Sequence, residues 1–182
     1  MKKSILFSVL VLTILVTSCN NVQEARYPIS QTSSKFLNES IARNKIIINS
    51  EEQTFENMFK QDTTNTYIPS TKGFWYRYNK KIEDNTPLPV RGDIVLYEYE
   101  VYDINESLIY SKEDTQPQRY LVDKETIMTG LRYGIKQMKQ GEEATFYFPS
   151  HIAYGYHGDD KSIGTNVPLI CKVKINQIIK SN

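Results

Sequence analysis

The hydrophobic positions between residues 129 and 141 have the spacing of a helix. Leu131, Ile135 and Met138 lie four and three positions apart, which places them on one helical face. Thr129 is a residue type that caps the start of a helix, and Gly141 is expected to end it. This segment therefore predicts a short helix with one buried face.

The pattern changes to that of a strand immediately afterwards. Residues 144–148 alternate between small and aromatic side chains, which is typical of a half-buried strand, and Pro149 ends the alternation. The next loop, residues 151–155, is expected to carry Tyr154 out towards solvent. Residues 129–155 thus predict a helix–strand–loop unit around which the rest of the chain is organised.

Alternating side chains also mark the two longest strands. Residues 94–102 alternate so that Tyr99 belongs to the inner face, and residues 108–110 follow after a turn that suits a hairpin. Residues 167–179 alternate in the same way and place Cys171 on the inner face. These segments predict antiparallel strands with one buried face.

Shorter strands are expected at residues 73–78 and 119–122. Polar or Pro- and Gly-containing segments at residues 83–90, 112–118 and 155–166 are interpreted as loops. The sum is an α+β fold, in which an antiparallel sheet of five to six strands packs on one short crossing helix.

Residues 34–60 predict a helical arm, because apolar residues recur four or seven positions apart. The capping-box spacing of residues 50–53 allows a break near Asn49. The apolar stripe either packs on the chain's own domain or forms a dimer or partner helix. It is not sustained over three or four heptads, which favours the first interpretation. The stripe consists of Leu37, Ile41, Ile48, Phe55 and Phe59.

The first 18 residues have the order of residue types found in a signal peptide. Lys2 and Lys3 precede an apolar run that is shorter than the roughly 20 residues needed to span a bilayer. The small residues before Cys19 resemble the lipobox of bacterial lipoproteins. This resemblance implies cleavage before Cys19, acylation of that residue, and a membrane-anchored position in the bacterial cell envelope, facing the periplasm. The alternative is an ordinary signal peptide with an accidental cysteine.

Charge and composition argue against several other classes. The net charge of +1 gives no electrostatic case for binding nucleic acid. If Cys19 is acylated, Cys171 has no disulfide partner. His151 and His157 share a loop without metal-ligand spacing, so we expect neither a metal nor a cofactor.

Several ordered motifs occupy residues 73–180. They are Pro89 and Arg91-Gly92-Asp93 before the strand with Tyr99, Thr129-Gly130-Leu131 with Gly134, Ile135, Met138 and Gly141, Ala153-Tyr154-Gly155, and Ile163-Gly164-Thr165-Asn166-Val167-Pro168-Leu169. In this order they resemble the FK506-binding-protein (FKBP) type of peptidyl-prolyl cis-trans isomerase. The lipobox and the helical arm together resemble, more narrowly, the gliding-motility-associated lipoprotein isomerases.

The resemblance implies a curved sheet wrapped over the helix, with an apolar groove between them for proline-containing polypeptides. The Tyr154 hydroxyl and the backbone N–H of Met128 would donate to substrate carbonyls, with Tyr99 as the third catalytic residue. The residues implied to bind substrate are Ile109, Tyr110, Ile127, Leu131, Ile163 and Cys171.

The sequence departs from the family pattern inside this groove. Ile109 and Tyr110 stand where the family has an aromatic residue followed by Asp, and Leu131, Cys171 and Gln118 replace aromatic residues. Without the carboxylate the groove loses an acceptor, and with fewer aromatic side chains it becomes wider and wetter. We therefore expect weak catalysis and a changed preference for the residue before proline.

Two functions follow from these features. The first is an envelope isomerase that assists the folding of exported proteins by stabilising a twisted X–Pro amide in the groove. The second is a catalytically weak chaperone or binding module, associated with a motility or secretion apparatus. The expected layout is a signal peptide at 1–18, a tether at 19–33, a helical arm and linker at 34–72, and the isomerase domain at 73–182.

Overall fold

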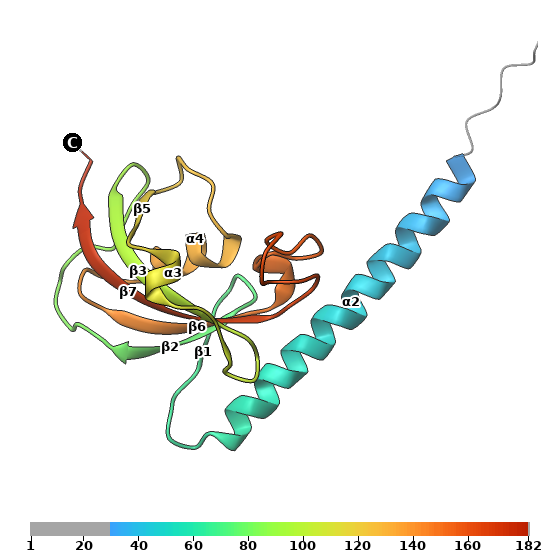
Figure 1. The fold of residues 1–182 in the computed structure, drawn as a ribbon, viewed down its shortest axis with the longest axis horizontal. Coiled ribbons are helices and arrows are strands. Elements are labelled where there is room, and N and C mark those ends of the chain that lie inside the picture. The colour runs from blue at the N-terminus through green and yellow to red at the C-terminus, as the bar shows by residue number, and fades with distance from the viewer. Residues whose placement is uncertain (1–29, 182) are drawn as a thin grey trace, which may run out of the picture. The chain divides into compact units, whose positions relative to one another are not determined.

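The computed structural model describes residues 30–181 (Figure 1). The helical elements of this part are α2 (Ser30–Gln61), α3 (Lys112–Thr115), α4 (Thr129–Ile135) and the 3-10 helix η1 (Ser150–Ile152). The strands are β1 (Ile68–Pro69), β2 (Trp75–Lys80), β3 (Ile94–Tyr102), β4 (Leu108–Tyr110), β5 (Gln118–Leu121), β6 (Glu143–Phe148) and β7 (Leu169–Ile179). Within the described part, residues 40–181 belong to one compact unit, and residues 30–39 belong to another.

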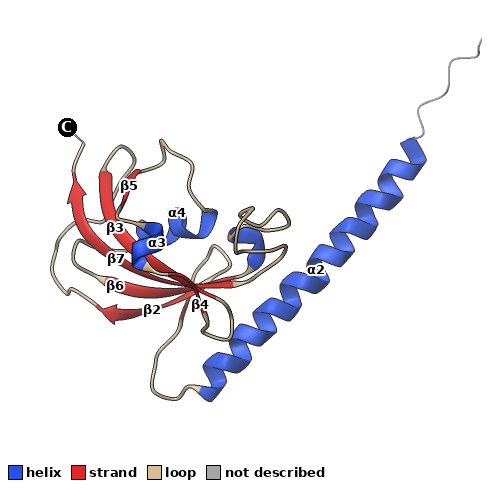
Figure 2. Cartoon of the chain, in the orientation of Figure 1, coloured by secondary structure: helices blue, strands red, loops and turns tan. Residues whose placement is uncertain are grey.

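The strands form one antiparallel sheet in the order β1-β2-β6-β7-β3-β4, and β5 also pairs with β3 (Figure 2). In the central pair, Tyr99 lies opposite Val173 and Val101 lies opposite Cys171. The predicted α+β class with an antiparallel sheet is confirmed, as are the inward faces of the two long strands. The sheet has seven strands rather than five or six, because the two-residue β1 pairs with β2 at its edge.

The short helix α4 packs closely on one face of the sheet. Leu131 and Ile135 of α4 are buried, as their spacing predicts, and Met138 is buried beyond the helix, because α4 ends at Ile135 rather than at the expected Gly141. Gly130 and Gly134 face the sheet, where an added Cβ would lie 2.6 Å from the Phe148 ring and 2.8 Å from the Phe146 ring. The two glycines therefore let the helix backbone approach these rings.

Two local predictions about short helices are wrong. The residue that precedes α4 is Met128, without a side-chain cap, and Thr129 is the first residue inside the helix. Residues 112–118, expected to be a loop, contain α3, because the side chains of Ser111 and Asp114 form a capping box around its first turn.

The opposite face of the sheet is covered by the carboxyl-terminal half of α2. Phe55 is fully buried against Tyr147 of β6 and Trp75 of β2, and Phe59 packs on the same aromatic rings. The prediction of a half-buried β6 is therefore wrong, since Ala144–Phe148 is buried on both faces. The helix also continues through Asn49 without a break, and this half of its stripe packs on the chain's own sheet.

The Arg91-Gly92-Asp93 motif fastens the carboxyl-terminal end of the chain to the start of β3. The carboxylate of Asp93 is buried, and it accepts hydrogen bonds from the Val90 N–H, the Ser181 N–H and the Lys180 ammonium, each at 2.9 Å. Burial alone would raise the pKa of Asp93, but these hydrogen bonds outweigh it and lower the pKa to about 2. The motif is structural rather than part of a site.

Cys19, the signal-peptide residues and the first part of the tether lie outside the described residues. Among residues 30–181, no helix is both long and apolar enough to cross a membrane.

Candidate active site

A pocket of about 330 Å³ opens beside β3, between α3 and the loop that follows η1. Three tyrosines from separate elements line it, namely Tyr99 of β3, Tyr110 of β4 and Tyr154 of the loop after η1. All three belong to the set of expected site residues. The sheet and the loop therefore bring together residues that lie up to 55 positions apart in the sequence.

The other six expected site residues lie in the hydrophobic core to which these tyrosines pack. Leu131, Ile163 and Cys171 are almost completely buried, so they belong to the core beneath the tyrosines and do not line the pocket. Ile109, Ile127 and Met128 are half-buried at its edge. Met128 precedes the first turn of α4, where a backbone N–H has no acceptor within the helix.

Tyr154 is half-buried rather than exposed to solvent, so the prediction of a solvent-facing tip is wrong. Its ring packs against the main core because η1 turns the chain back towards the sheet. Burial, with smaller contributions from Tyr99 and Cys171, raises the pKa of Tyr154 well above the ordinary value. Burial likewise raises the pKa of Tyr99. Both phenols therefore remain protonated and able to donate a hydrogen bond.

The hydroxyl groups of Tyr99 and Tyr154 are open to the pocket. Every buried side-chain oxygen and nitrogen atom in the described part of the chain has a hydrogen-bond partner. Neither of these hydroxyl groups bonds to another protein group there, so both reach the pocket's accessible surface. They are two donors that a bound carbonyl group could use.

Tyr110 connects β4 to the loop that carries Ile163. Its hydroxyl donates to a carboxylate oxygen of Asp159 at 2.5 Å and accepts from the Ser162 N–H at 3.1 Å. The other oxygen of Asp159 accepts from the Lys161 and Ile163 N–H groups at 3.0 and 2.8 Å. The phenol and the carboxylate thus hold one wall of the pocket in place.

Asp159 also corrects the expectation that the groove lacks a carboxylate acceptor. Tyr110 occupies the position where an acidic residue is expected, but its hydrogen-bond partner Asp159 supplies a carboxylate to the same wall. Desolvation acts to raise the pKa of Asp159, but the hydrogen bonds from Tyr110, Ile163 and Lys161 outweigh it and lower the pKa. The pocket therefore contains an ionised acceptor.

Four lining residues were not predicted from the sequence, namely Asp114, Thr115, Asp159 and Lys161. Thr115 donates through its hydroxyl to the Tyr99 carbonyl at 2.7 Å, which joins α3 to β3. The Ser111-x-x-Asp114 spacing was a detectable signal for α3. For Asp159 and Lys161 the sequence offered no comparable signal, because they belong to a polar loop. Gln118 lies in β5, outside the pocket lining.

Comparison with known proteins finds related sequences. The family model described as FKBP-type peptidyl-prolyl cis-trans isomerase matches residues 85–176. A curated relative, the probable FKBP-type peptidyl-prolyl cis-trans isomerase FkpA of Neisseria meningitidis serogroup B, is 29% identical over 150 residues. That match covers 79% of this chain and 54% of the relative, so the chain spans about half the length of the curated relative that it matches.

Solved structures share the fold. FkpA from Escherichia coli superposes with a TM-score of 0.60 at 19% identity, over 96% of this chain and 83% of that one. A peptidyl-prolyl cis-trans isomerase from Pseudomonas syringae pv. tomato superposes with a TM-score of 0.58 at 18% identity, over 75% of this chain and 96% of the other.

Proposed function

The chain belongs to the FKBP-type peptidyl-prolyl cis-trans isomerase family, and we propose that it catalyses rotation about X–Pro bonds in the pocket formed by Tyr99, Tyr110 and Tyr154. The observation that carries this proposal is the pair of accessible phenol donors, on Tyr99 and Tyr154, whose rings pack against the buried apolar core. The proposed substrates are proline-containing segments of polypeptides.

The reaction suits such a pocket because no covalent bond is made or broken. Rotation about the amide bond must cross a barrier of about 18–20 kcal/mol, which arises from resonance in the planar form. The twisted amide has less charge separation, so apolar surroundings disfavour it less than the planar form. Hydrogen bonds from Tyr154 and from the Met128 N–H would hold the flanking carbonyls while the bond turns. Each tenfold acceleration requires about 1.4 kcal/mol of preference for the twisted form.

The proposed location is the bacterial cell envelope, with the chain anchored through an acylated Cys19 and facing the periplasm. The lipobox-like residues before Cys19 support this location. There the isomerase would assist the folding of exported proteins, and the arrangement of lipobox, arm and isomerase domain favours a lipoprotein of the gliding-motility type. Metabolic labelling with an alkyne fatty acid, with Cys19→Ala as control, would test the anchor. Labelling that persists in the variant would disprove it.

The isomerase proposal is tested with cis-to-trans isomerisation of X–Pro peptides. We expect acceleration over buffer that falls in Tyr154→Phe, because that variant keeps the ring and loses the donor. Tyr156→Phe is the matched control, since Tyr156 is an exposed neighbour in the same loop. A rate equal to that of buffer alone would disprove the enzymatic function.

A second candidate function is a chaperone that holds apolar segments without isomerising them. The exposed side chains of Ile41 and Ile46 on α2 favour it, since they offer apolar surface in addition to the pocket. It predicts that Tyr154→Phe suppresses the aggregation of an unfolded client as well as the unchanged protein does. A parallel loss of holding and isomerisation would contradict it.

The same exposed residues support a further proposal, that two copies of the chain associate through residues 34–60. Sedimentation equilibrium of the protein in detergent, compared with an Ile41→Asp/Ile46→Asp variant, tests this association. A monomer at high concentration would contradict it.

A further inference from the structure

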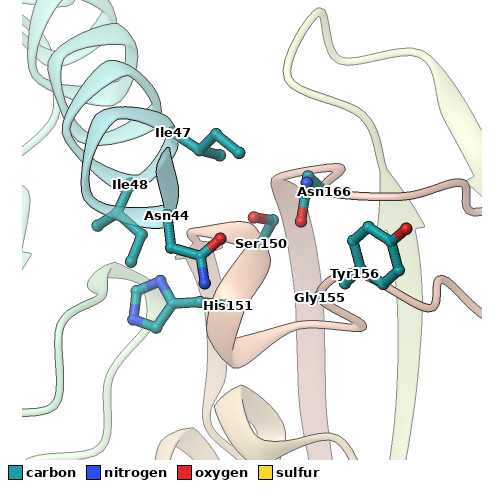
Figure 3. Close-up of a pocket in the computed structure, with 8 residues that line it drawn as sticks. All are labelled: Asn44, Ile47, Ile48, Ser150, His151, Gly155, Tyr156 and Asn166. Carbon is teal, nitrogen blue, oxygen red and sulfur yellow. The ribbon is translucent and has the colours of Figure 1, made fainter. Parts of the chain in front are cut away.

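A buried carboxylate from α2 lies against the segment that leads to Tyr154. Glu51 is only 8% exposed, and its two carboxylate oxygens accept from the Ser150 N–H at 2.8 Å and the Ser150 hydroxyl at 2.7 Å. The two residues are 99 positions apart, and Ser150 is also buried. Figure 3 shows Ser150 and His151 facing the same helix, near Asn44 and Ile48.

Ser150 in turn fixes the backbone on both sides of Tyr154. Its carbonyl accepts from the Ala153 N–H at 3.0 Å and from the Gly155 N–H at 2.8 Å. The Gly155 carbonyl accepts from the Asn166 N–H at 2.8 Å. This bond joins the turn to the later part of the same loop, beyond the pocket residues Asp159 and Lys161. A chain of hydrogen bonds therefore runs from Glu51 through Ser150 to the two residues that flank Tyr154.

The position of Glu51 is itself held by packing. Phe55, one turn further along α2, is fully buried against Tyr147 of β6, the strand that leads directly into Ser150. A buried carboxylate is costly to desolvate unless strong hydrogen bonds compensate, and here both oxygens are satisfied by one residue. Truncation of Glu51 would leave the buried Ser150 N–H without this acceptor.

We propose that Glu51 is a positioning residue for Tyr154, and that the carboxyl-terminal half of α2 is part of the active-site structure rather than only a spacer. This inference rests on the proposed isomerase function, because it assigns the direction of the Tyr154 hydroxyl to Glu51. Tyr154 would hold the substrate carbonyl in both the planar and the twisted state. Its misplacement should therefore raise KM more than it lowers kcat.

The kinetic test compares the full chain with three variants. Glu51→Ala should raise KM for an X–Pro peptide about tenfold and change kcat less than about twofold. Glu51→Gln keeps one oxygen for the Ser150 N–H and an amide for the hydroxyl, so it should stay within about twofold of the unchanged chain. Glu56→Ala, which removes an exposed carboxylate from the same helix, is the matched control. Equal KM values for Glu51→Ala and Glu56→Ala would overturn the proposal.

A double-variant cycle tests whether Glu51 acts through Tyr154. If it does, Glu51→Ala should add less than about twofold to the KM of Tyr154→Phe. A full tenfold effect on top of Tyr154→Phe would show that Glu51 acts elsewhere, and would overturn the proposal.

Backbone hydrogen exchange gives a readout that does not depend on activity. The amides of Ala153 and Gly155 should exchange about tenfold faster in Glu51→Ala than in Glu56→Ala, because their acceptor Ser150 is no longer held. If the unchanged chain proves inactive, the isomerase proposal fails, and unchanged exchange would still overturn the positioning role. Should Glu51→Ala not fold, Ser150→Ala removes only the hydroxyl bond, and the same shift in exchange, smaller in size, is required.

Discussion

The hydroxyl of Tyr110 donates a hydrogen bond to the carboxylate of Asp159, and the two residues are 49 positions apart in the sequence. This bond joins the edge strand β4 to the loop that carries Ile163, and both residues line the pocket. It brings a carboxylate to a site where the sequence pattern indicates that one is missing. The pocket therefore has a carboxylate on its polar wall, but Asp159 supplies it from the loop, and a tyrosine stands at position 110 where the acidic residue is expected.

Removal of this bond should loosen the pocket wall. We expect Tyr110→Phe to lower the free energy of unfolding by about 1–2 kcal/mol, since it removes a charge-assisted hydrogen bond. The value of kcat/KM should fall about fivefold, because the loop with Ile163 is less well placed. Urea denaturation and the peptide assay measure the two effects. Tyr156→Phe is the control, and equal losses in both variants would contradict the role of Tyr110.

The activity of the pocket should depend little on pH. The pKa of Asp159 is lowered, so its carboxylate is ionised at every pH above the ordinary pKa of an aspartate. The pKa values of Tyr99 and Tyr154 are raised, so both phenols are protonated at every pH below the ordinary pKa of a tyrosine. We therefore expect kcat/KM for an uncharged X–Pro peptide to change less than about twofold between about pH 5 and pH 9. Tyr154→Phe should give an equally flat profile at a lower level. A decline above about pH 8 would show that a pocket tyrosine loses its proton.

The close approach of α4 to the sheet should not tolerate a methyl group. We expect Gly130→Ala to lower the free energy of unfolding by about 1–3 kcal/mol, because the new Cβ would lie 2.6 Å from the Phe148 ring. Equilibrium denaturation measures the change. Gly164→Ala is the matched control, since its Cβ would be 3.9 Å from the nearest atom, on Val167. Similar denaturation midpoints for the two variants would show that α4 can shift away from the Phe148 ring without loss of stability.

Alternating and helical spacings of apolar residues are sufficient to predict which faces of β3, β7 and α4 are buried. Each of these faces meets the main core directly, so Tyr99, Cys171 and Leu131 could be placed from local spacing alone. The fold class followed from these elements.

The errors arose where a distant part of the chain decides the environment. β6 is buried on both faces because Phe55, about 90 positions earlier, covers its outer side. Asp159 meets Tyr110 across 49 positions, and Glu51 reaches Ser150 across 99 positions. Local spacing contains no information on such pairs, and both carboxylates have the appearance of ordinary surface residues in the sequence.

The hydrogen bonds that join Asp93 to Lys180 and Ser181 should make the free energy of unfolding depend on pH in the acidic range. The pKa of Asp93 is lowered to about 2 in the folded protein, against about 4 in an unfolded chain, so its stabilisation is complete above about pH 4 and is lost as the pH falls towards 2. At neutral pH, Asp93→Asn should be less stable than the unchanged chain by roughly 1–3 kcal/mol, because it weakens the hydrogen bonds from Val90, Ser181 and Lys180. Urea unfolding at several pH values should show this gap shrinking between about pH 4 and pH 2. The exposed Asp160→Asn should show no such gap at any pH. If the difference in unfolding free energy between Asp93→Asn and the unchanged chain stays constant down to pH 2, ionisation of Asp93 does not stabilise the folded protein.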